Sequence, residues 1–182
     1  VGGELNAFTT KEETVIHATT LKSDLEKAVE LIADITFNST FPEKEIEKEK
    51  TVIYDEIDSY RDSPSELIFD DFEDLLFAGS SIGHNTLGTK KSIKRFTSND
   101  IRSFINRTYN TNEMVLAIVG QISPNKVQRW AEKYFAMQTA NNREFSREVP
   151  DKHITFTKKA HKTTFQAHCV IGDRAYDINT GT

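Results

Sequence analysis

The acidic stretch between residues 43 and 60 contains the spacing with the clearest potential for chemistry. Glu49 and Glu56 are seven residues apart, so on a helix they would lie two turns apart on nearly the same face. Glu56 stands beside Ile53 and Ile57, which predicts that its carboxylate approaches the interior and needs a compensating cation or hydrogen-bond donors. A zinc ion held by one carboxylate and two imidazoles would meet that need. Spacing alone leaves a second interpretation open, and favours it: both glutamates belong to a charged, solvated helix face.

The histidines and the cysteine do not form a metal or nucleophile site by local spacing. No two histidines stand four residues apart on a helical stretch, as they would on a zinc-binding helix. We therefore interpret each as a surface or core histidine; they are His17, His84, His153, His161 and His168. Cys169 is the only cysteine, which excludes an intrachain disulfide, and its apolar neighbours predict a small buried core residue.

The elements that would position these residues form an irregular series of strands and helices. Residues 4–20 predict two strands joined by a hairpin loop at 11–13, and Ser23 with Glu26 predicts a capping box at the start of a helix. Further helices are predicted at 43–60, 64–77, 90–95, 97–109 and from 123 onward, and further strands at 114–120, 154–160 and 163–172. This order predicts an α+β fold with helices packed on one face of a largely antiparallel sheet.

Length and charge limit the domain organisation and the partners. The 182 residues are enough for one sizeable domain and the start of another. We expect a first domain at 1–139, a polar linker at 140–152 and the start of a second domain at 153–182. The net charge of −5 argues against nucleic acid as a partner, and no apolar run is long enough to span a bilayer. We expect a soluble protein, with its compartment, cytoplasmic or periplasmic, left open.

Four segments, taken together and in order, resemble one protein family. They are GGELNAFTTKEETVIHA at 2–18, EIEKEKTVIYDEI at 45–57, IGHNTLGT at 82–89 and FINRTYNTNEMVLAIVGQIS at 104–123. Each is similar to a stretch of the insulinase and pitrilysin family of zinc peptidases (M16), although Asn85 stands where that family usually has proline. The last stretch of the chain, HITFTKKAHKTTFQAHCVIGDRAY, resembles the opening of the next homologous domain of that family.

The resemblance implies a zinc-dependent metalloendopeptidase that cleaves peptides or small unfolded proteins. In that family Glu56 would be the third zinc ligand and Glu49 a supporting catalytic acid. The histidines of the family's H-x-x-E-H motif are expected upstream of this chain, so the chain alone is expected to be inactive. Asn6, Ala7 and Phe8 would line the substrate channel, on an edge strand that pairs with an extended peptide.

The resemblance also implies partners. These are peptide substrates and either the remaining homologous domains or a second subunit of a clam-shell chamber. Self-association is expected as well, through apolar surface that further segments would otherwise cover. The alternative function is a non-catalytic partner subunit with a structural or substrate-binding role. Retention of both glutamates, Glu49 and Glu56, favours the peptidase.

Overall fold

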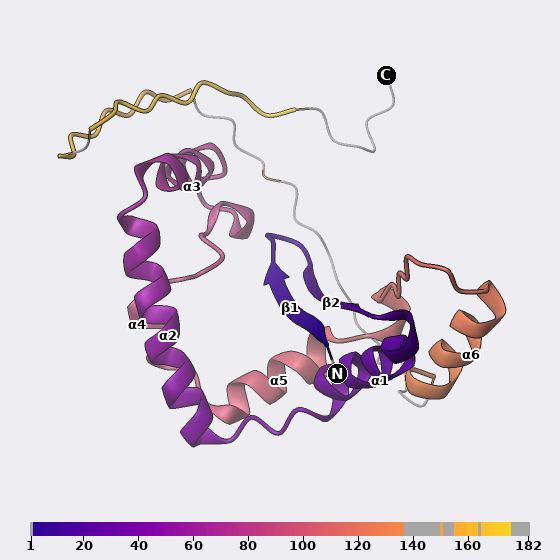
Figure 1. The fold of residues 1–182 in the computed structure, drawn as a ribbon. Coiled ribbons are helices and arrows are strands. Elements are labelled where there is room, and N and C mark those ends of the chain that lie inside the picture. The colour runs from indigo at the N-terminus through magenta and orange to yellow at the C-terminus, as the bar shows by residue number, and fades with distance from the viewer. Residues whose placement is uncertain (1, 137–149, 151–154, 164, 176–182) are drawn as a thin grey trace. The chain divides into compact units, whose positions relative to one another are not determined.

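The computed structural model describes residues 2–136, 150, 155–163 and 165–175 (Figure 1). The chain divides into two compact units. The first unit comprises residues 1–47 and 96–145, and the second comprises residues 48–95 and 146–182. The division falls inside one continuous helix, α2 (Glu43–Arg61). No described helix is both long and apolar enough to cross a bilayer.

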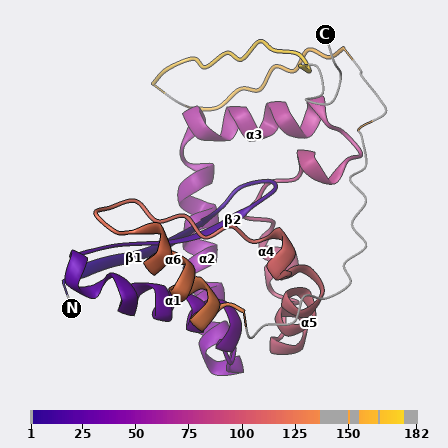
Figure 2. The same cartoon turned by 90° about the vertical axis from the view of Figure 1, so that its right-hand side faces the viewer.

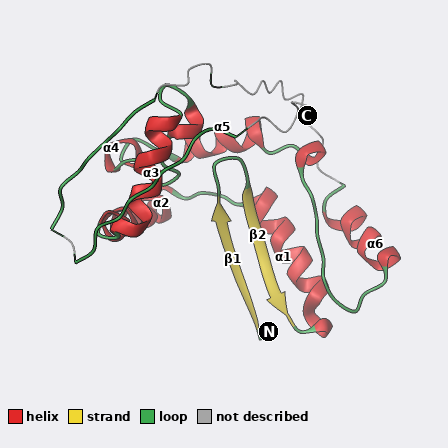
Figure 3. Cartoon of the chain, turned by 90° about the horizontal axis from the view of Figure 1, so that it is seen from above, coloured by secondary structure: helices red, strands yellow, loops and turns green. Residues whose placement is uncertain are grey.

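The first unit contains the hairpin that the sequence predicts. Strands β1 (Gly3–Thr9) and β2 (Thr14–Thr20) pair antiparallel, with Phe8 opposite Val15 (Figures 1 and 3). The loop between them closes locally, because the backbone N–H of Thr10 donates to the carbonyl of Glu13 at 2.8 Å. The other elements of this unit are a 3-10 turn (Lys22–Asp24), α1 (Leu25–Asn38), α5 (Ser98–Thr108), a 3-10 turn (Thr111–Glu113) and α6 (Pro124–Tyr134).

The core of the first unit lies where α1 packs against α6. Val29 of α1 and Trp130 of α6 are both buried, with exposed fractions of 3% and 5%. At the ends of these helices the rings of Phe37 and Phe135 meet edge to face with centroids 5.9 Å apart. Aromatic side chains bury large apolar areas and favour such edge-to-face contacts. This packing therefore fixes α6 on α1.

The start of α5 holds the connection between α1 and α2. Thr97 and Asp100 form a capping box at the start of the helix that the sequence predicts over 97–109. Ser98, the residue after Thr97, is buried. Its backbone N–H donates to the carboxylate of Glu43 at 2.9 Å, and its hydroxyl donates to the carbonyl of Phe41 at 2.7 Å. Phe41 has a positive φ of 49°, a conformation that non-glycine residues rarely adopt and that the surroundings must hold in place.

The second unit is built on helices. It contains most of α2, α3 (Pro64–Leu76), a 3-10 turn (Ser81–Gly83) and the short α4 (Lys90–Ile93). Ile57 and Leu76 are buried in it. The α2 residue Asp58 pairs with Lys90 of α4, and Asp70 of α3 accepts a hydrogen bond from Asn85 in the following loop. These polar contacts connect the loop and α4 to the longer helices.

The C-terminal stretch of the second unit contacts α3. The ring of Phe156 lies 5.6 Å from that of Phe72, and the Arg174 guanidinium donates to the carbonyl of Leu76 at 2.8 Å. The same guanidinium stands 5.3 Å from the ring centroid of Phe77, a cation–π geometry. Arg174 is therefore the main polar anchor that joins this stretch to the end of α3.

The α+β class and the predicted helices are confirmed, but three predicted strands are wrong in their described parts. The segments 114–120, 155–160 and 163–172, without residue 164, contain no assigned strand, and the described sheet has only two strands. A strand is defined by a ladder of hydrogen bonds with a neighbouring strand, and the only ladder assigned among the described residues joins β1 to β2. The division at 139 and 152 stays a prediction, because most of the linker lies outside the described residues.

Two local predictions are also wrong. Ser23 does not cap a helix with Glu26; a 3-10 turn takes up residue 23, and α1 begins at Leu25 with no side-chain cap. Glu26 instead accepts a hydrogen bond from Lys133 of α6, so tertiary packing has replaced the local box. Cys169 is exposed rather than buried, because its segment has no layer of structure over it among the described residues.

Candidate functional site

Helix α2 presents one buried face that determines where its glutamates point. Ile46, Lys50 and Ile57 are all buried, with exposed fractions of 8%, 8% and 4%. Each residue turns the helix by about 100°, so these three positions fall on one narrow face. The Lys50 ammonium, although buried, donates to the backbone carbonyl of Lys94 at 3.4 Å. Ile46, Lys50 and Ile57 therefore define the buried face of α2.

Glu49 and Glu56 both lie on one flank of this buried face and both are exposed. The prediction that Glu56 approaches the interior is wrong, because the adjacent Ile57 takes the inward position and residue 56 is turned away by about a quarter of a circle. Val52, the apolar residue that lies between them on the same flank, is 48% exposed. Among the described residues neither carboxylate has a hydrogen-bond or ion-pair partner, so both are open to a ligand from outside.

The spacing of the two carboxylates separates their roles. Seven residues of helix span about 10.5 Å, whereas two carboxylates on one zinc ion each place an oxygen within about 2.2 Å of it. Glu49 and Glu56 therefore cannot hold the same ion. If one is a metal ligand, the other acts on it only through intervening groups.

A zinc ion fits this chain only in part. Within the described residues no three histidine, cysteine, aspartate or glutamate side chains come close enough together to hold a metal. The Glu56 carboxylate has the right donor chemistry for one ligand position, and it is exposed on a regular helix. The described residues thus offer one exposed carboxylate donor, whereas a catalytic zinc site takes three protein ligands.

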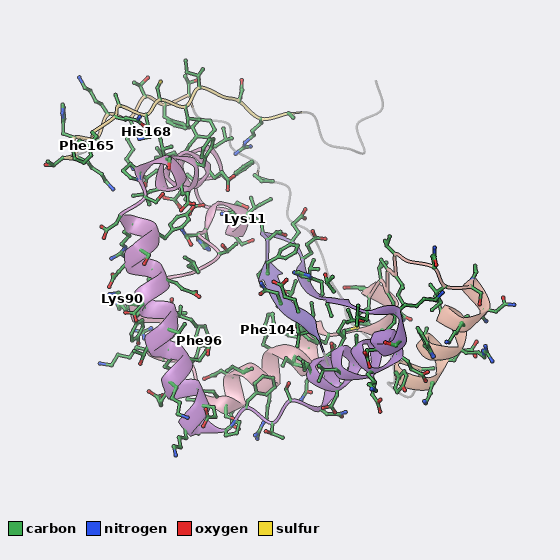
Figure 4. The ribbon with its side chains drawn as sticks, in the orientation of Figure 1. Lys11, Lys90, Phe96, Phe104, Phe165 and His168 are labelled. Carbon is green, nitrogen blue, oxygen red and sulfur yellow. The ribbon has the colours of Figure 1, made fainter. Side chains whose placement is uncertain are left out.

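The predicted substrate-binding residues lie together on β1. Asn6, Ala7 and Phe8 are all exposed, and the described β1 has a neighbour, β2, on one edge only. The backbone N–H of Ala7 donates to the Asn6 side-chain oxygen at 2.8 Å. Figure 4 marks the loop end of this hairpin at Lys11. The strand therefore has the free edge that pairing with an extended peptide requires.

Sequence reasoning missed a basic hollow between α1 and α6. Its volume is about 260 Å³, and its lining residues are Glu26, Lys126, Arg129, Trp130 and Lys133. The Lys126 ammonium stands 4.9 Å from the Trp130 ring centroid. A hydrogen bond from Lys133 lowers the pKa of Glu26 below its ordinary value. The spacing of the three cations, at positions 126, 129 and 133 of one helix, is the sequence signal that could have located it.

The fold matches solved structures of M16 peptidase domains. The M16 inactive domain from Pseudomonas fluorescens superimposes with a TM-score of 0.74 at 21% identity, over 84% of this chain and 37% of that one. A protease from Helicobacter pylori gives a TM-score of 0.71 at 25% identity, over 82% of this chain and 36% of that one. The architecture is therefore that of an M16 peptidase domain.

Sequence comparison gives the same result. The family model for insulinase (peptidase family M16) matches residues 1–90, and that for the peptidase M16 inactive domain matches residues 95–181. The chain belongs to peptidase family M16. It is 32% identical to the uncharacterized zinc protease YmxG of Bacillus subtilis over 98% of this chain and 43% of that protein. It is 34% identical to the beta subunit of the mitochondrial-processing peptidase of Saccharomyces cerevisiae over 74% of this chain and 29% of that protein. The chain spans about two fifths of the length of the first of these relatives.

Proposed function

We propose that this chain is part of a zinc-dependent metalloendopeptidase that cleaves peptides or small unfolded proteins. The observation that carries the proposal is the exposed Glu56 carboxylate on the flank of α2, with no partner among the described residues. Family membership supports it, since several relatives are named zinc proteases. The remaining ligands and the general base would come from outside the described residues.

In this proposal Glu56 holds the metal and Glu49 supports the site from one side. A zinc ion bound in such a site polarises the scissile carbonyl and lowers the pKa of a bound water. The buried residues of α2 keep the helix from rotating, so the Glu56 carboxylate is presented in one direction. Glu49, about 10.5 Å along the helix, would orient neighbouring groups by charge and hydrogen bonding.

The substrate would add to the free edge of β1 as a further antiparallel or parallel strand. To do so it must take over the Ala7 N–H, which now donates to the Asn6 side chain. That exchange replaces one hydrogen bond with another, so its net free energy is small. The exposed Phe8 ring would then give the bound peptide an apolar contact.

The test compares three variants of the complete gene product. Glu56→Gln keeps the size of the side chain but weakens a metal ligand, so we expect zinc content and kcat/KM to fall by about 100-fold or more, beyond what a supporting residue contributes. Glu49→Gln is expected to lower activity by about 10–100-fold with smaller zinc loss. Asp55→Asn is the matched control, because Asp55 is exposed on the same helix but directed away from that flank. Metal analysis and hydrolysis of an unstructured peptide measure both effects.

If the Glu56→Gln variant keeps full zinc content and activity, Glu56 is not a zinc ligand. The alternative function, a non-catalytic partner subunit, is supported by the match of residues 95–181 to a family model described as inactive. It predicts that the complete product binds no zinc and cleaves nothing by itself. It also predicts that the product forms a stable complex with an active M16 subunit, which co-purification of the two proteins would detect.

A further inference from the structure

Lys50 of α2 is the one charged side chain that is buried among the described residues, with an exposed fraction of 8%. A buried ammonium is costly unless hydrogen-bond acceptors replace the water that it loses. Here the ammonium donates to the backbone carbonyl of Lys94 at 3.4 Å. Lys94 caps the C-terminal end of the short α4, where carbonyl groups lack partners within the helix and carry partial negative charge. Lys50 therefore fastens α2 to the end of α4, inside the second unit.

Two further contacts join the same pair of helices. Positions 50, 54 and 58 stand four residues apart, so they follow one row along α2. Lys90 of α4 pairs with Asp58, and its ammonium stands 5.9 Å from the ring centroid of Tyr54. Figures 1 and 2 show α4 beside the middle of α2, and Figure 4 labels Lys90 there. The Asp58–Lys90 pair is exposed, so water and salt weaken it, whereas the Lys50 contact is shielded.

Lys50 and the two glutamates lie on opposite sides of the buried face of α2. At about 100° per residue, Ile46 and Ile57 point in nearly the same direction. Lys50 is turned about 30° to one side of that direction, whereas Glu49 and Glu56 are turned about 70° and about 90° to the other. Rotation of α2 about its own axis would move both sides at once. Holding Lys50 in place therefore also holds the direction of the two carboxylates.

A small rotation of α2 would be enough to displace the carboxylates. A helix with its side chains has a radius of about 5–6 Å, so a rotation of about 10° moves a side-chain tip by about 1 Å. Misplacement by about 1 Å can lower a catalytic rate about 100-fold. Ile46 and Ile57 determine which face is buried, but apolar contacts are not directional and tolerate small rotations. A hydrogen bond weakens as its geometry departs from linearity, so the Lys50 contact restrains this rotation.

We propose that Lys50 is a positioning residue, whose buried hydrogen bond to the Lys94 carbonyl fixes the rotation of α2. It thereby directs the carboxylates of Glu49 and Glu56. The importance of that direction for zinc binding rests on the proposed function, whereas the restraint on α2 does not. In this role Lys50 acts through the two carboxylates and not on the metal or the substrate directly.

The first experiment measures the zinc dissociation constant, kcat and KM of the complete gene product. Lys50→Met keeps an unbranched side chain in the buried position but removes the donor. We expect zinc affinity and kcat to fall by about 10–100-fold, as for other groups that orient metal ligands, with little change in KM. The free energy of unfolding should change little, because removal of a buried charge offsets the lost hydrogen bond. Lys50→Arg keeps a charged donor and should lose less than about tenfold.

Asp58→Asn is the matched control for this experiment. Asp58 also joins α2 to α4, but its pair with Lys90 is exposed. Its loss should therefore change zinc affinity and kcat by less than about fivefold.

The second experiment measures the orientation of α2 without zinc. Nitroxide labels are attached at Val52→Cys, on the glutamate flank, and at Phe69→Cys on α3, with all other cysteines replaced by serine. Both sites are exposed, at 48% and 59%, and both lie in the second unit. Double electron–electron resonance should give a broader distance distribution in Lys50→Met than in the unmodified protein or in Asp58→Asn.

The outcomes distinguish the role of Lys50 from the proposed function. If the unmodified product binds no zinc, the proposed function is wrong, and the label distances still test the restraint on α2. An unchanged distance distribution in Lys50→Met would overturn the role of Lys50. So would unchanged zinc affinity and kcat in a product that does bind zinc, or an equal loss in Asp58→Asn. A large fall in the unfolding free energy of Lys50→Met would also overturn it, because Lys50 would then serve stability rather than orientation.

Discussion

The β1–β2 hairpin and the segment 115–119 show opposite relations between composition and structure. The hairpin includes polar residues such as Asn6, His17 and several threonines, yet it forms two regular strands. The segment 115–119 is wholly apolar and has the stronger strand composition, yet it has no assigned strand. Strand propensity describes how well side chains fit a sheet that already exists. Pairing, rather than composition, therefore decided which segment became a strand.

The hairpin and the segment 115–119 differ in the chain connections that flank them. In the hairpin, the Thr10 hydroxyl oxygen accepts hydrogen bonds from the backbone N–H groups of Glu12 and Glu13, at 3.3 and 3.2 Å. This short turn brings β1 and β2 together with little loss of chain entropy. The segment 115–119 lies between two helices, so any partner must come from far along the chain or from another chain. Such pairing has a larger entropic cost before any hydrogen bond forms.

The largest change in unfolding free energy is expected from disrupting the α1–α6 core. The hairpin and the segment 115–119 each connect directly to one of these two helices. β2 runs on toward α1, and the segment runs on toward α6, where Trp130 is buried. Trp130→Ala should lower the free energy of unfolding by roughly 3–5 kcal/mol, since it removes a large buried side chain and leaves a cavity. Urea unfolding followed by circular dichroism measures the change. Arg129→Ala, an exposed neighbour, should shift it by less than about 0.5 kcal/mol, and an equal loss in both variants would contradict this role for Trp130.

A smaller effect is expected from crowding one end of the hairpin. A Cβ atom at Gly3 would lie 2.9 Å from the backbone oxygen of Thr19 on β2, whereas at Gly2 it would meet nothing within 4 Å. Gly3→Ala should therefore destabilise the hairpin by roughly 1–2 kcal/mol, within the usual range for a point substitution, and Gly2→Ala should not. Hydrogen exchange of the β1 and β2 amides reports the local opening. Similar protection in the two variants would show that the strand ends tolerate the contact.

The smallest effect is expected in the segment itself. Val119 is fully exposed, so Val119→Thr should change the unfolding free energy by less than about 0.5 kcal/mol. In β2 the half-buried Val15 lies opposite Phe8, and Val15→Thr should cost up to about 1 kcal/mol through loss of that cross-strand contact. Chemical denaturation at low protein concentration distinguishes the two. A larger loss at residue 119 than at residue 15 would mean that the segment packs against other parts of the chain.

Local signals predicted the helices well and the solvent exposure poorly. The helices predicted from residues 64, 97 and 123 begin at Pro64, Ser98 and Pro124, because the residues that start a helix act within one helical turn. The capping box predicted at Ser23 does not form, because the Glu26 side chain accepts a hydrogen bond from Lys133, which lies 107 residues further along the chain. Glu56 was predicted to point inward from its apolar neighbours, but one residue on a helix changes direction by about 100°, and Ile57 took the inward place.

The sequence by itself determined the family, the α+β class, the hairpin and the boundaries of most helices. Each depends on motifs and short-range hydrogen bonding that a few neighbouring residues contain. Only the tertiary structure decided that Glu56 is exposed beside a buried Ile57 and that α1 packs on α6 around Trp130. It also decided that residues 115–119 have no strand beside them among the described residues. These outcomes depend on contacts between residues far apart in the chain, which no local pattern records.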